Sequence, residues 1–342
     1  MKNEFFYLGI FLFFGNDVLE ENMEERLLAL LRLALKYNAT DIHFLQRYQD
    51  TVIEMRVDRL CYKVKGKFED YRLLRYLQYL ANLDVGNILT PQTGQFEMEV
   101  DGTLLSLRFA LINKLNYSNG VLRILNSRLK VDADSLSRIN AQNAFFKSLL
   151  SRTCGLVLFS GPTGSGKTTT LYSLLKSVRN RKIYTIEDPI EVYNDDFIQL
   201  AVNEALGFDY AAGVRQILRH DPDIIMIGEI REEAAARMAV TAANTGHLVL
   251  STIHTSRASS CISRMCELGV NDDHLYENLI CVSNQRMLTD KRNREKIVIY
   301  EIMDSREIEY YREHKKNSDS FISVEQQIQR GIMNGVFEET AY

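Results

Sequence analysis

Eight consecutive residues in the middle of the chain have the types and spacing of a phosphate-binding loop, Gly161-Pro162-Thr163-Gly164-Ser165-Gly166-Lys167-Thr168. Glycines let backbone N–H groups turn inward around phosphate oxygens, and a following helix adds the positive end of its dipole. We expect Lys167 to reach the β- and γ-phosphates and Thr168 to offer its hydroxyl to a nucleotide-bound Mg²⁺. Together with Thr169, which opens the helix, these residues predict a site for a nucleoside triphosphate.

The pattern around this loop predicts a parallel sheet. Short apolar runs alternate with helical patterns, with strands expected at 156–159, 183–186, 224–227 and 248–252 and helices at 169–175, 211–218 and 232–241. Such alternation indicates a parallel sheet covered on both faces, and ligands bind beyond the carboxyl ends of its strands. Polar groups follow three of the strands there, namely Glu187-Asp188, Gly228-Glu229-Ile230-Arg231 and Thr252-Ile253-His254-Thr255.

The upstream region mixes helix and strand and predicts a small α+β domain. A helix is expected from Met23, with one apolar face formed by Leu27, Leu30, Leu31, Ala34 and Leu35. Further elements are expected at 52–57, 73–83, 95–100, 104–112 and 120–125. We therefore predict an α/β protein with an N-terminal domain at 23–128, a linker at 129–142 and a nucleotide-binding domain at 143–342.

Residues 1–22 differ from the rest of the chain because they contain a continuous apolar run at 5–14. This run is too short to span a bilayer. No A-x-A-like cleavage site follows it. Three interpretations are open: a weak signal sequence, a membrane-contacting segment, or an untranslated extension of the reading frame with the protein starting at Met23. We favour the last, because a phosphate-binding ATPase belongs in the cytosol.

Composition narrows the class of protein. The chain has 342 residues, of which 46% are hydrophobic and 25% are charged. These fractions are enough to fill two hydrophobic cores and to keep the surface solvated. The net charge of −4 argues against a broad nucleic-acid surface. The cysteines form no C-x-x-C pair, so neither a disulfide framework nor a four-cysteine zinc site is indicated.

Four ordered boxes resemble those of the secretion ATPases of type II secretion, type IV pili and competence pseudopili. They are the phosphate loop, an acidic box at 185–191 (TIEDPIE), a Walker B box at 221–231 (DPDIIMIGEIR) and a histidine box at 245–255 (TGHLVLSTIHT). The resemblance runs from about Met23 to about Ile302. It implies a PAS-like first domain and a RecA-like ATPase domain with a C-terminal helical part.

The resemblance also implies roles for acidic residues. Glu229 would orient or activate the attacking water, although it could instead be a helix-capping acid. Gly228 stands where a Walker B aspartate is usual, which removes a conventional contact to Mg²⁺. Glu187 and Asp188 would then help Thr168 to position the metal or the water.

Histidines and arginines complete the implied site. His247 and His254 match the histidine box and would sense the γ-phosphate through a hydrogen bond, the alternative being neutral histidines satisfied within the sheet. Arg108 and Arg123 match a pair that reaches toward a neighbouring nucleotide and stabilises the transferring phosphoryl group. Alternatively, the two arginines are solvated residues of exposed strands without a role in the site.

Departures from the family pattern point to one branch. The chain lacks a tetracysteine module, a longer N-terminal partner domain and the late segment of retraction ATPases, and its tail is expected to be a charged helix at 307–316 followed by polar coil. It most resembles the competence pseudopilus ATPase of Gram-positive bacteria.

This resemblance implies a hexameric motor that uses ATP and Mg²⁺, without structural zinc, to assemble a pseudopilus for DNA uptake. It would work at the cytoplasmic face of the membrane with a polytopic platform protein and bind no specific nucleic acid. Pilus retraction, type II secretion, a phosphate-loop kinase, a nucleotide-regulated binding protein and a DNA translocase are the alternatives.

Overall fold

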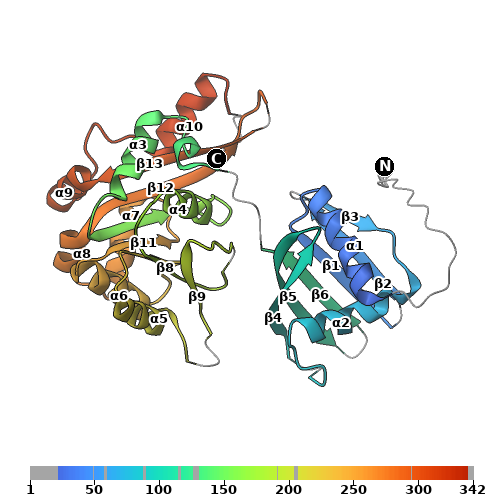
Figure 1. The fold of residues 1–342 in the computed structure, drawn as a ribbon. Coiled ribbons are helices and arrows are strands. Elements are labelled where there is room, and N and C mark those ends of the chain that lie inside the picture. The colour runs from blue at the N-terminus through green and yellow to red at the C-terminus, as the bar shows by residue number, and fades with distance from the viewer. Residues whose placement is uncertain are drawn as a thin grey trace. The chain divides into compact units, whose positions relative to one another are not determined.

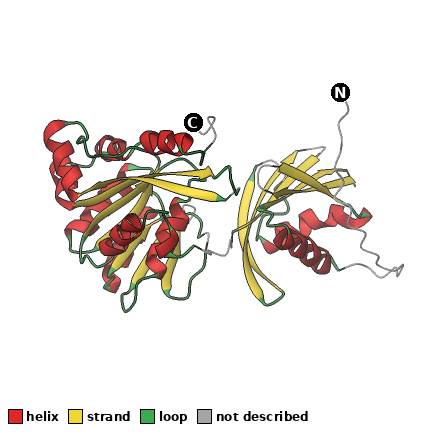
Figure 2. Cartoon of the chain, turned by 90° about the horizontal axis from the view of Figure 1, so that it is seen from above, coloured by secondary structure: helices red, strands yellow, loops and turns green. Residues whose placement is uncertain are grey.

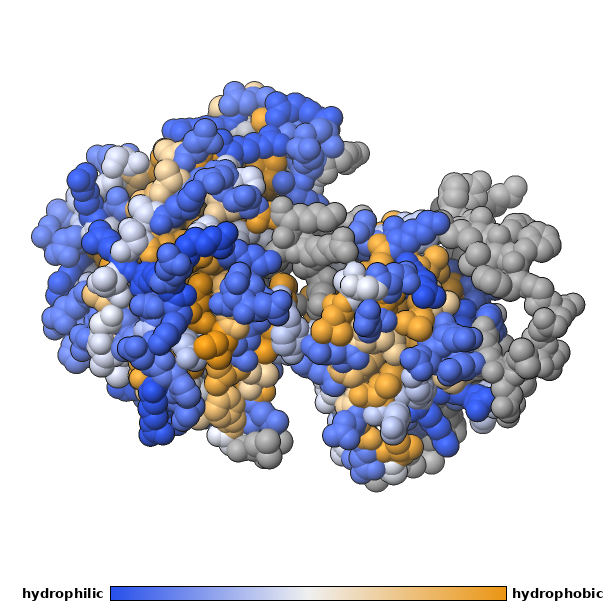
Figure 3. All heavy atoms as spheres, in the orientation of Figure 1, coloured by the Kyte–Doolittle hydropathy of each residue, from blue (hydrophilic) through white to orange (hydrophobic). Residues whose placement is uncertain are grey.

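The computed structural model describes residues 22–48, 50–57, 60–87, 90–114, 117–125, 131–190, 192–203, 207–293 and 295–337. They belong to two compact units, Met1–Arg128 and Leu129–Tyr342, shown in Figure 1. Our hypothesis about the apolar leader falls on residues 1–21, outside the described part of the chain. No helix within the described ranges is long and apolar enough to cross a membrane. Hydrophilic residues cover most of the visible surface of each unit (Figure 3).

The first unit is an antiparallel six-stranded sheet in the order β3-β2-β1-β6-β5-β4. Its strands are β1 (Asp41–Arg47), β2 (Asp50–Val57), β3 (Leu60–Val64), β4 (Gln92–Val100), β5 (Thr103–Lys114) and β6 (Tyr117–Ile124). Two helices, α1 (Met23–Lys36) and α2 (Leu73–Leu80), lie on the same side of this sheet (Figure 2). The turn between β4 and β5 has positive φ at Asp101 and Gly102, as an Asp-Gly hairpin requires.

The core of the first unit lies between these helices and one face of the sheet. Leu27, Leu30 and Leu31 of α1 are buried there, whereas Leu35, expected on the same face, is 38% exposed. Gly120 on β6 makes room for α2, because a Cβ at this position would lie 2.5 Å from Leu74 Cδ2. The opposite face of the sheet carries no helix of this unit among the described residues (Figure 2).

The second unit is a seven-stranded sheet in the order β13-β12-β7-β11-β10-β8-β9, with only β13 antiparallel to its neighbour. Its strands are β7 (Gly155–Ser160), β8 (Ile183–Glu187), β9 (Phe197–Ala201), β10 (Ile224–Ile227), β11 (Leu248–Ile253), β12 (Leu279–Thr289) and β13 (Lys296–Asp304). Its helices are α3 (Asn140–Leu149), α4 (Lys167–Lys176), α5 (Tyr210–Ile217), α6 (Glu233–Asn244), α7 (Ala258–Glu267), α8 (Asp272–Asn278), α9 (Ser305–His314) and α10 (Val324–Met333).

Helices cover both faces of this second sheet. Leu156 and Leu158 of β7 pack in a cluster with α5 and α6, while Val157 and Phe159 of the same strand pack in another cluster with α3 and α4. A strand buried on both faces usually has a near-continuous apolar run, which is why residues 156–159 of β7 show no polar alternation. The predicted α/β fold, with a small α+β first domain and a mainly parallel second sheet, is confirmed.

Part of the segment that we assigned to a linker packs onto the second unit. A short 3₁₀ helix η2 (Ala133–Ser135) precedes α3, and both Ala133 and Leu136 are buried in the cluster that contains α4. Ser173 of α4 donates a hydrogen bond to the Val131 carbonyl at 2.8 Å. Ala133 and Leu136, two of the apolar residues spaced along this polar stretch, are therefore core residues of the second unit.

The tail differs from the predicted polar coil. The expected charged helix is α9, but the coil is replaced beyond it by α10. Ser323 and Gln326 form a reciprocal capping box at the start of α10, and Val324 and Ile328 are buried. The buried Glu301 carboxylate also accepts hydrogen bonds from the N–H groups of Ala258, at the start of α7, and Val324. The polar-coil prediction was wrong because isolated apolar residues at helical spacing are enough to dock a short helix.

Candidate nucleotide site

The phosphate loop joins the end of β7 to the start of α4. Its three glycines, Gly161, Gly164 and Gly166, have φ of +141°, +79° and +88°, a region that side chains other than glycine rarely adopt. Gly161 is constrained by packing as well, because a Cβ there would lie 2.4 Å from the Gln285 carbonyl oxygen. A Cβ at Gly164 would meet nothing within 4 Å, so this glycine is needed for its backbone conformation.

Lys167 and two threonines lie at the N-terminus of α4, directly after the glycines of the loop. Lys167 is 8% exposed, and its Nζ donates to the carbonyls of Gly161 at 2.9 Å and Pro162 at 3.1 Å. Thr168 and Thr169 follow it and are half-buried. An ammonium group beside glycine-rich backbone at a helix start matches the negative charge and the acceptor oxygens of a polyphosphate.

The sheet register brings the other boxes to this edge. Ile253 of β11 pairs with Ser160 of β7, so His254 follows beside the phosphate loop. The neighbour on the other side of β11 is β10. Its residue Ile227 pairs with Ser251 of β11 and with Ile186 of β8. The Walker B and acidic boxes therefore follow at the same edge, where the Thr252 hydroxyl donates to the Gly228 carbonyl at 2.7 Å.

Glu229 lies between a histidine and an arginine. Its Oε2 is 2.6 Å from Arg231 Nε and 3.6 Å from His254 Nε2, and its side chain is 14% exposed. Burial and the nearby charge of Lys167 lower the pKa of His254, and the opposing effect of Glu229 is smaller. His254 is thus neutral at pH 7 and keeps one N–H for donation.

Glu187 is held by the phosphate-loop helix. Its carboxylate is 3% exposed, and its two oxygens accept from the Tyr172 hydroxyl at 2.7 and 2.8 Å. The Thr185 hydroxyl donates to the same carboxylate at 2.7 Å. The next residue, Asp188, is exposed. The described part of the acidic box therefore presents the Glu187 carboxylate bonded to protein donors and Asp188 open to solvent.

The structure separates the two histidines of the histidine box. His247 precedes β11, whereas His254 follows it, so the strand lies between them. The His247 carbonyl accepts from Gly155 N at the amino end of β7, and its Nδ1 is 3.2 Å from the Ala242 carbonyl. Within this unit, His247 lies at the edge of the sheet opposite the phosphate loop.

Arg108 and Arg123 belong to the first unit. They pair directly across β5 and β6, next to the buried core positions Leu107 and Leu122, and so share the sheet face away from α1 and α2. Arg123 Nε donates to Asp41 Oδ1 at 2.7 Å, and Asp41 is 3% exposed. Burial acts to raise the pKa of Asp41, but hydrogen bonds from Arg123 and Thr40 outweigh it and hold the pKa below its usual value.

Two tyrosines at this site were not predicted from the sequence. Tyr172 binds Glu187, as described above, and Tyr210 is 8% exposed at the start of α5. Burial and the negative charges of Glu229 and Asp188 raise the pKa of Tyr210, so its hydroxyl stays protonated. An Asp209 N-cap signal places Tyr210 at a helix start, but its neighbours come from distant segments of the chain.

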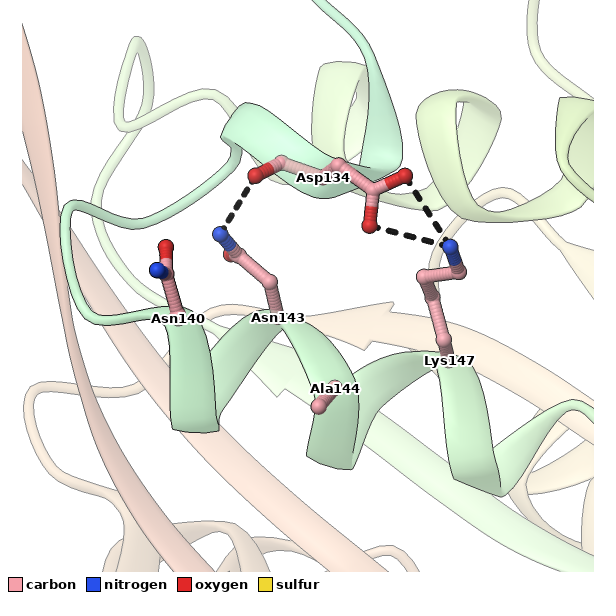
Figure 4. A pocket seen from close by; sticks show the side chains of 5 residues that line it. All are labelled: Asp134, Asn140, Asn143, Ala144 and Lys147. Atoms are coloured by element: carbon pink, nitrogen blue, oxygen red, sulfur yellow. Dashed lines mark hydrogen bonds and ion pairs between the residues drawn. The ribbon is translucent and has the colours of Figure 1, made fainter.

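A polar hollow elsewhere in the second unit is separate from this site. It lies between η2 and α3 and is lined by Asp134, Asn140, Asn143, Ala144 and Lys147 (Figure 4). Asn143 donates to the Asp134 carbonyl at 2.7 Å, and Lys147 Nζ lies 2.9 Å from the Asp134 carboxylate (Figure 4). Its charges are compensated internally, and it contains none of the predicted site residues.

A glycine-rich loop between a buried parallel strand and a helix, with acidic and histidine boxes at the same edge, defines a phosphate-loop α/β protein. The family model described as "Type II/IV secretion system protein" matches residues 18–333, and the chain belongs to this family. It is 33% identical to competence protein ComGA of Bacillus subtilis, over 92% of this chain and 95% of that protein. It is 35% identical to type II secretion system protein E of Pseudomonas aeruginosa, over 76% of this chain and 53% of that protein.

Solved structures share the fold. The pilus retraction motor PilT with bound ADP superposes with a TM-score of 0.71 at 25% identity, over 91% of this chain and 94% of that one. The ATPase DotB of Legionella pneumophila superposes with a TM-score of 0.71 at 19% identity, over 95% and 96% of the two chains.

Proposed function

We propose that this protein is an ATP-hydrolysing motor that powers assembly of a competence pseudopilus for DNA uptake. One observation carries the ATPase part, namely that Lys167, Glu229 and His254 meet at the carboxyl edge of a parallel sheet. The competence part is supported by identity along nearly the full length of ComGA proteins. Pilus retraction or type II secretion is the alternative within the same family.

Each side chain at this edge has a distinct task in hydrolysis. The loop amides and Lys167 hold the phosphates, and the ammonium compensates charge that develops during transfer. Glu229, ion-paired with Arg231, orients and activates the attacking water. Neutral His254, next to Glu229, donates a hydrogen bond to the γ-phosphate and so distinguishes ATP from ADP.

Mg²⁺ fits this donor set as a companion of the nucleotide. No group of three or more His, Cys, Asp and Glu residues suited to a metal ion occurs in the described ranges. Mg²⁺ commonly keeps several waters and binds phosphates, so one hydroxyl and one carboxylate suffice. Thr168 would supply the hydroxyl, and Asp188 would supply an accessible carboxylate from the described part of the acidic box. When bound, the ion neutralises charge on the β- and γ-phosphates.

Motor action requires that the two units change their arrangement between nucleotide states. A ligand shifts such an equilibrium only by its differential affinity for the two arrangements. We propose a homo-hexamer in which Arg108 and Arg123 complete a site across the interface, acting on a polytopic platform protein at the cytoplasmic face of the membrane. This role is supported by the pairing of the two arginines across neighbouring strands, on the sheet face away from α1 and α2.

Hydrolysis of ATP by the full chain, compared with Glu229→Gln, tests the proposal. Glu229→Gln keeps the size of the side chain and removes its negative charge. We expect the variant to bind nucleotide and lose hydrolysis by about 10²-fold or more, since a general base contributes about that much. Equal rates in both proteins would overturn the assignment, and a gene replacement with this variant that leaves transformation normal would overturn the competence role.

A further inference from the structure

Two consecutive polar residues lie buried in β12, beside the phosphate loop. Asn284 and Gln285 are each 0% exposed. Asn284 pairs with Ser160, the last residue of β7 before the loop. Buried carboxamides are costly unless they are hydrogen-bonded, so their presence in the middle of a core strand calls for a specific task.

Gln285 lies against both ends of the glycine-rich turn, and its side chain is hydrogen-bonded to the later one. Its Nε2 donates to the Ser165 carbonyl at 2.7 Å, near the end of the loop. Its own carbonyl faces the first glycine so closely that a Cβ on Gly161 would lie 2.4 Å away. Its Oε1 has no hydrogen-bond partner among the described residues, so the bond to Ser165 is what the side chain contributes there.

Asn284 holds a different segment, because successive side chains of a strand point to opposite faces. Its Nδ2 donates to Ser160 Oγ at 2.8 Å and to the Thr255 carbonyl at 3.1 Å. Ser160 immediately precedes the phosphate loop, and Thr255 immediately follows His254. This single carboxamide therefore links the base of the loop to the end of the histidine box.

We propose that Gln285 and Asn284 are positioning residues, Gln285 for the phosphate loop and Asn284 for the spacing between that loop and His254. This inference rests on the proposed nucleotide binding. A loop released from Gln285 is competent to bind phosphates for only part of the time, and apparent affinity falls in proportion to that fraction. A displaced His254 leaves phosphate binding intact and affects the transition state, where small misplacements are costly.

The test is whether one variant changes nucleotide affinity alone and the other changes turnover alone. Gln285→Met keeps the length of the side chain and removes its donor, so we expect the Kd for ADP and the KM for ATP to rise about tenfold, with kcat within about twofold of the original. Asn284→Leu should instead lower kcat about tenfold and leave the Kd for ADP within about twofold. ADP binding by calorimetry and steady-state ATP hydrolysis give these values.

Gln327→Met is the matched control. Gln327 Nε2 donates to the Tyr300 carbonyl at 2.8 Å, which is the same kind of bond in the same unit but away from the loop. We expect it to change thermal stability without changing Kd, KM or kcat. Should Gln285→Met fail to fold, Gln285→Leu removes the same donor with a shorter apolar side chain, and it provides the same comparison.

The outcomes separate this inference from the proposed function. If the unsubstituted chain binds no ADP, the nucleotide function fails. If it binds ADP and Gln285→Met binds equally well, with only a lower melting temperature, Gln285 is structural and the inference is overturned. Matching changes of Kd and kcat in both variants would overturn the assignment of separate tasks.

Discussion

The two units place their charged side chains in contrasting ways. In the first unit a row of charged residues crosses the sheet face opposite α1 and α2, with Arg56, Asp41, Arg123 and Arg108 in successive register positions. In the second unit both sheet faces are covered, and the site's charged side chains, such as Lys167 and Glu229, lie where strands end. The parallel sheet therefore gathers the phosphate-site residues at one edge, whereas the antiparallel sheet carries its charged residues across one face, where the proposed function needs arginines that act on a neighbouring copy.

The largest effect should come from the loop lysine. We expect Lys167→Ala to lower ATP hydrolysis by about 10³-fold and to abolish DNA uptake, because no other ammonium lies in the loop to compensate the phosphate charge. Circular dichroism should show an unchanged fold. Normal transformation by this variant would contradict the motor function.

The next effect compares the units directly. We expect Arg123→Ala to lower kcat by about 10²-fold or more while leaving the Kd for ADP unchanged, as for an arginine that acts on the transferring phosphoryl group. Arg56→Ala is the matched control, since Arg56 Nε lies 3.9 Å from the same Asp41 carboxylate. Equal losses in both variants would mean that the arginines only stabilise the first unit.

A pH profile sharpens the assignment within the second unit. Burial and the charge of Lys167 lower the pKa of His254 below its usual value, so the neutral form predominates at pH 7 and is lost as pH falls through the folded pKa. We expect kcat to be flat between pH 7 and 8 and to fall severalfold as the pH is lowered through the folded pKa of His254. His254→Gln, which keeps a donor, should lack this acidic decline, and an identical decline in that variant would assign it to another group.

The smallest effect concerns the C-terminal helix. Ser323→Ala removes the side-chain cap of α10 and should lower the free energy of unfolding by about 1 kcal/mol. Because α10 contributes no residue to the phosphate site, the KM for ATP should not change. Chemical denaturation and initial rates measure the two quantities, and a raised KM would extend the site to this helix.

Local patterns were enough to predict the loop, the strand before it and the carboxyl edge. Glycines with positive φ and runs of apolar residues leave a direct trace in the sequence. The separation of the two box histidines was also predictable, since a six-residue strand at about 3.3 Å per residue puts them roughly 20 Å apart. The resemblance to the family assigned both histidines to one role, but the length of the strand between them places them at opposite ends of β11.

Other features depend on contacts between distant segments. Strand β12 carries Asn284 and Gln285 at its centre, and buried polar residues interrupt the apolar run by which a core strand is recognised. Tyr172 and Glu187 lie on different elements, and their hydrogen bonds exist only once α4 packs on the sheet. Such pairings follow from the assembled fold and leave no local pattern.

The most direct test of the account is the ATP hydrolysis rate per subunit, measured against protein concentration from nanomolar to tens of micromolar with Glu229→Gln as the blank. If each phosphate site is completed by arginines of a neighbouring copy, the rate per subunit rises steeply with concentration and then reaches a plateau. A rate that is independent of concentration, or equal to the blank, would contradict the account.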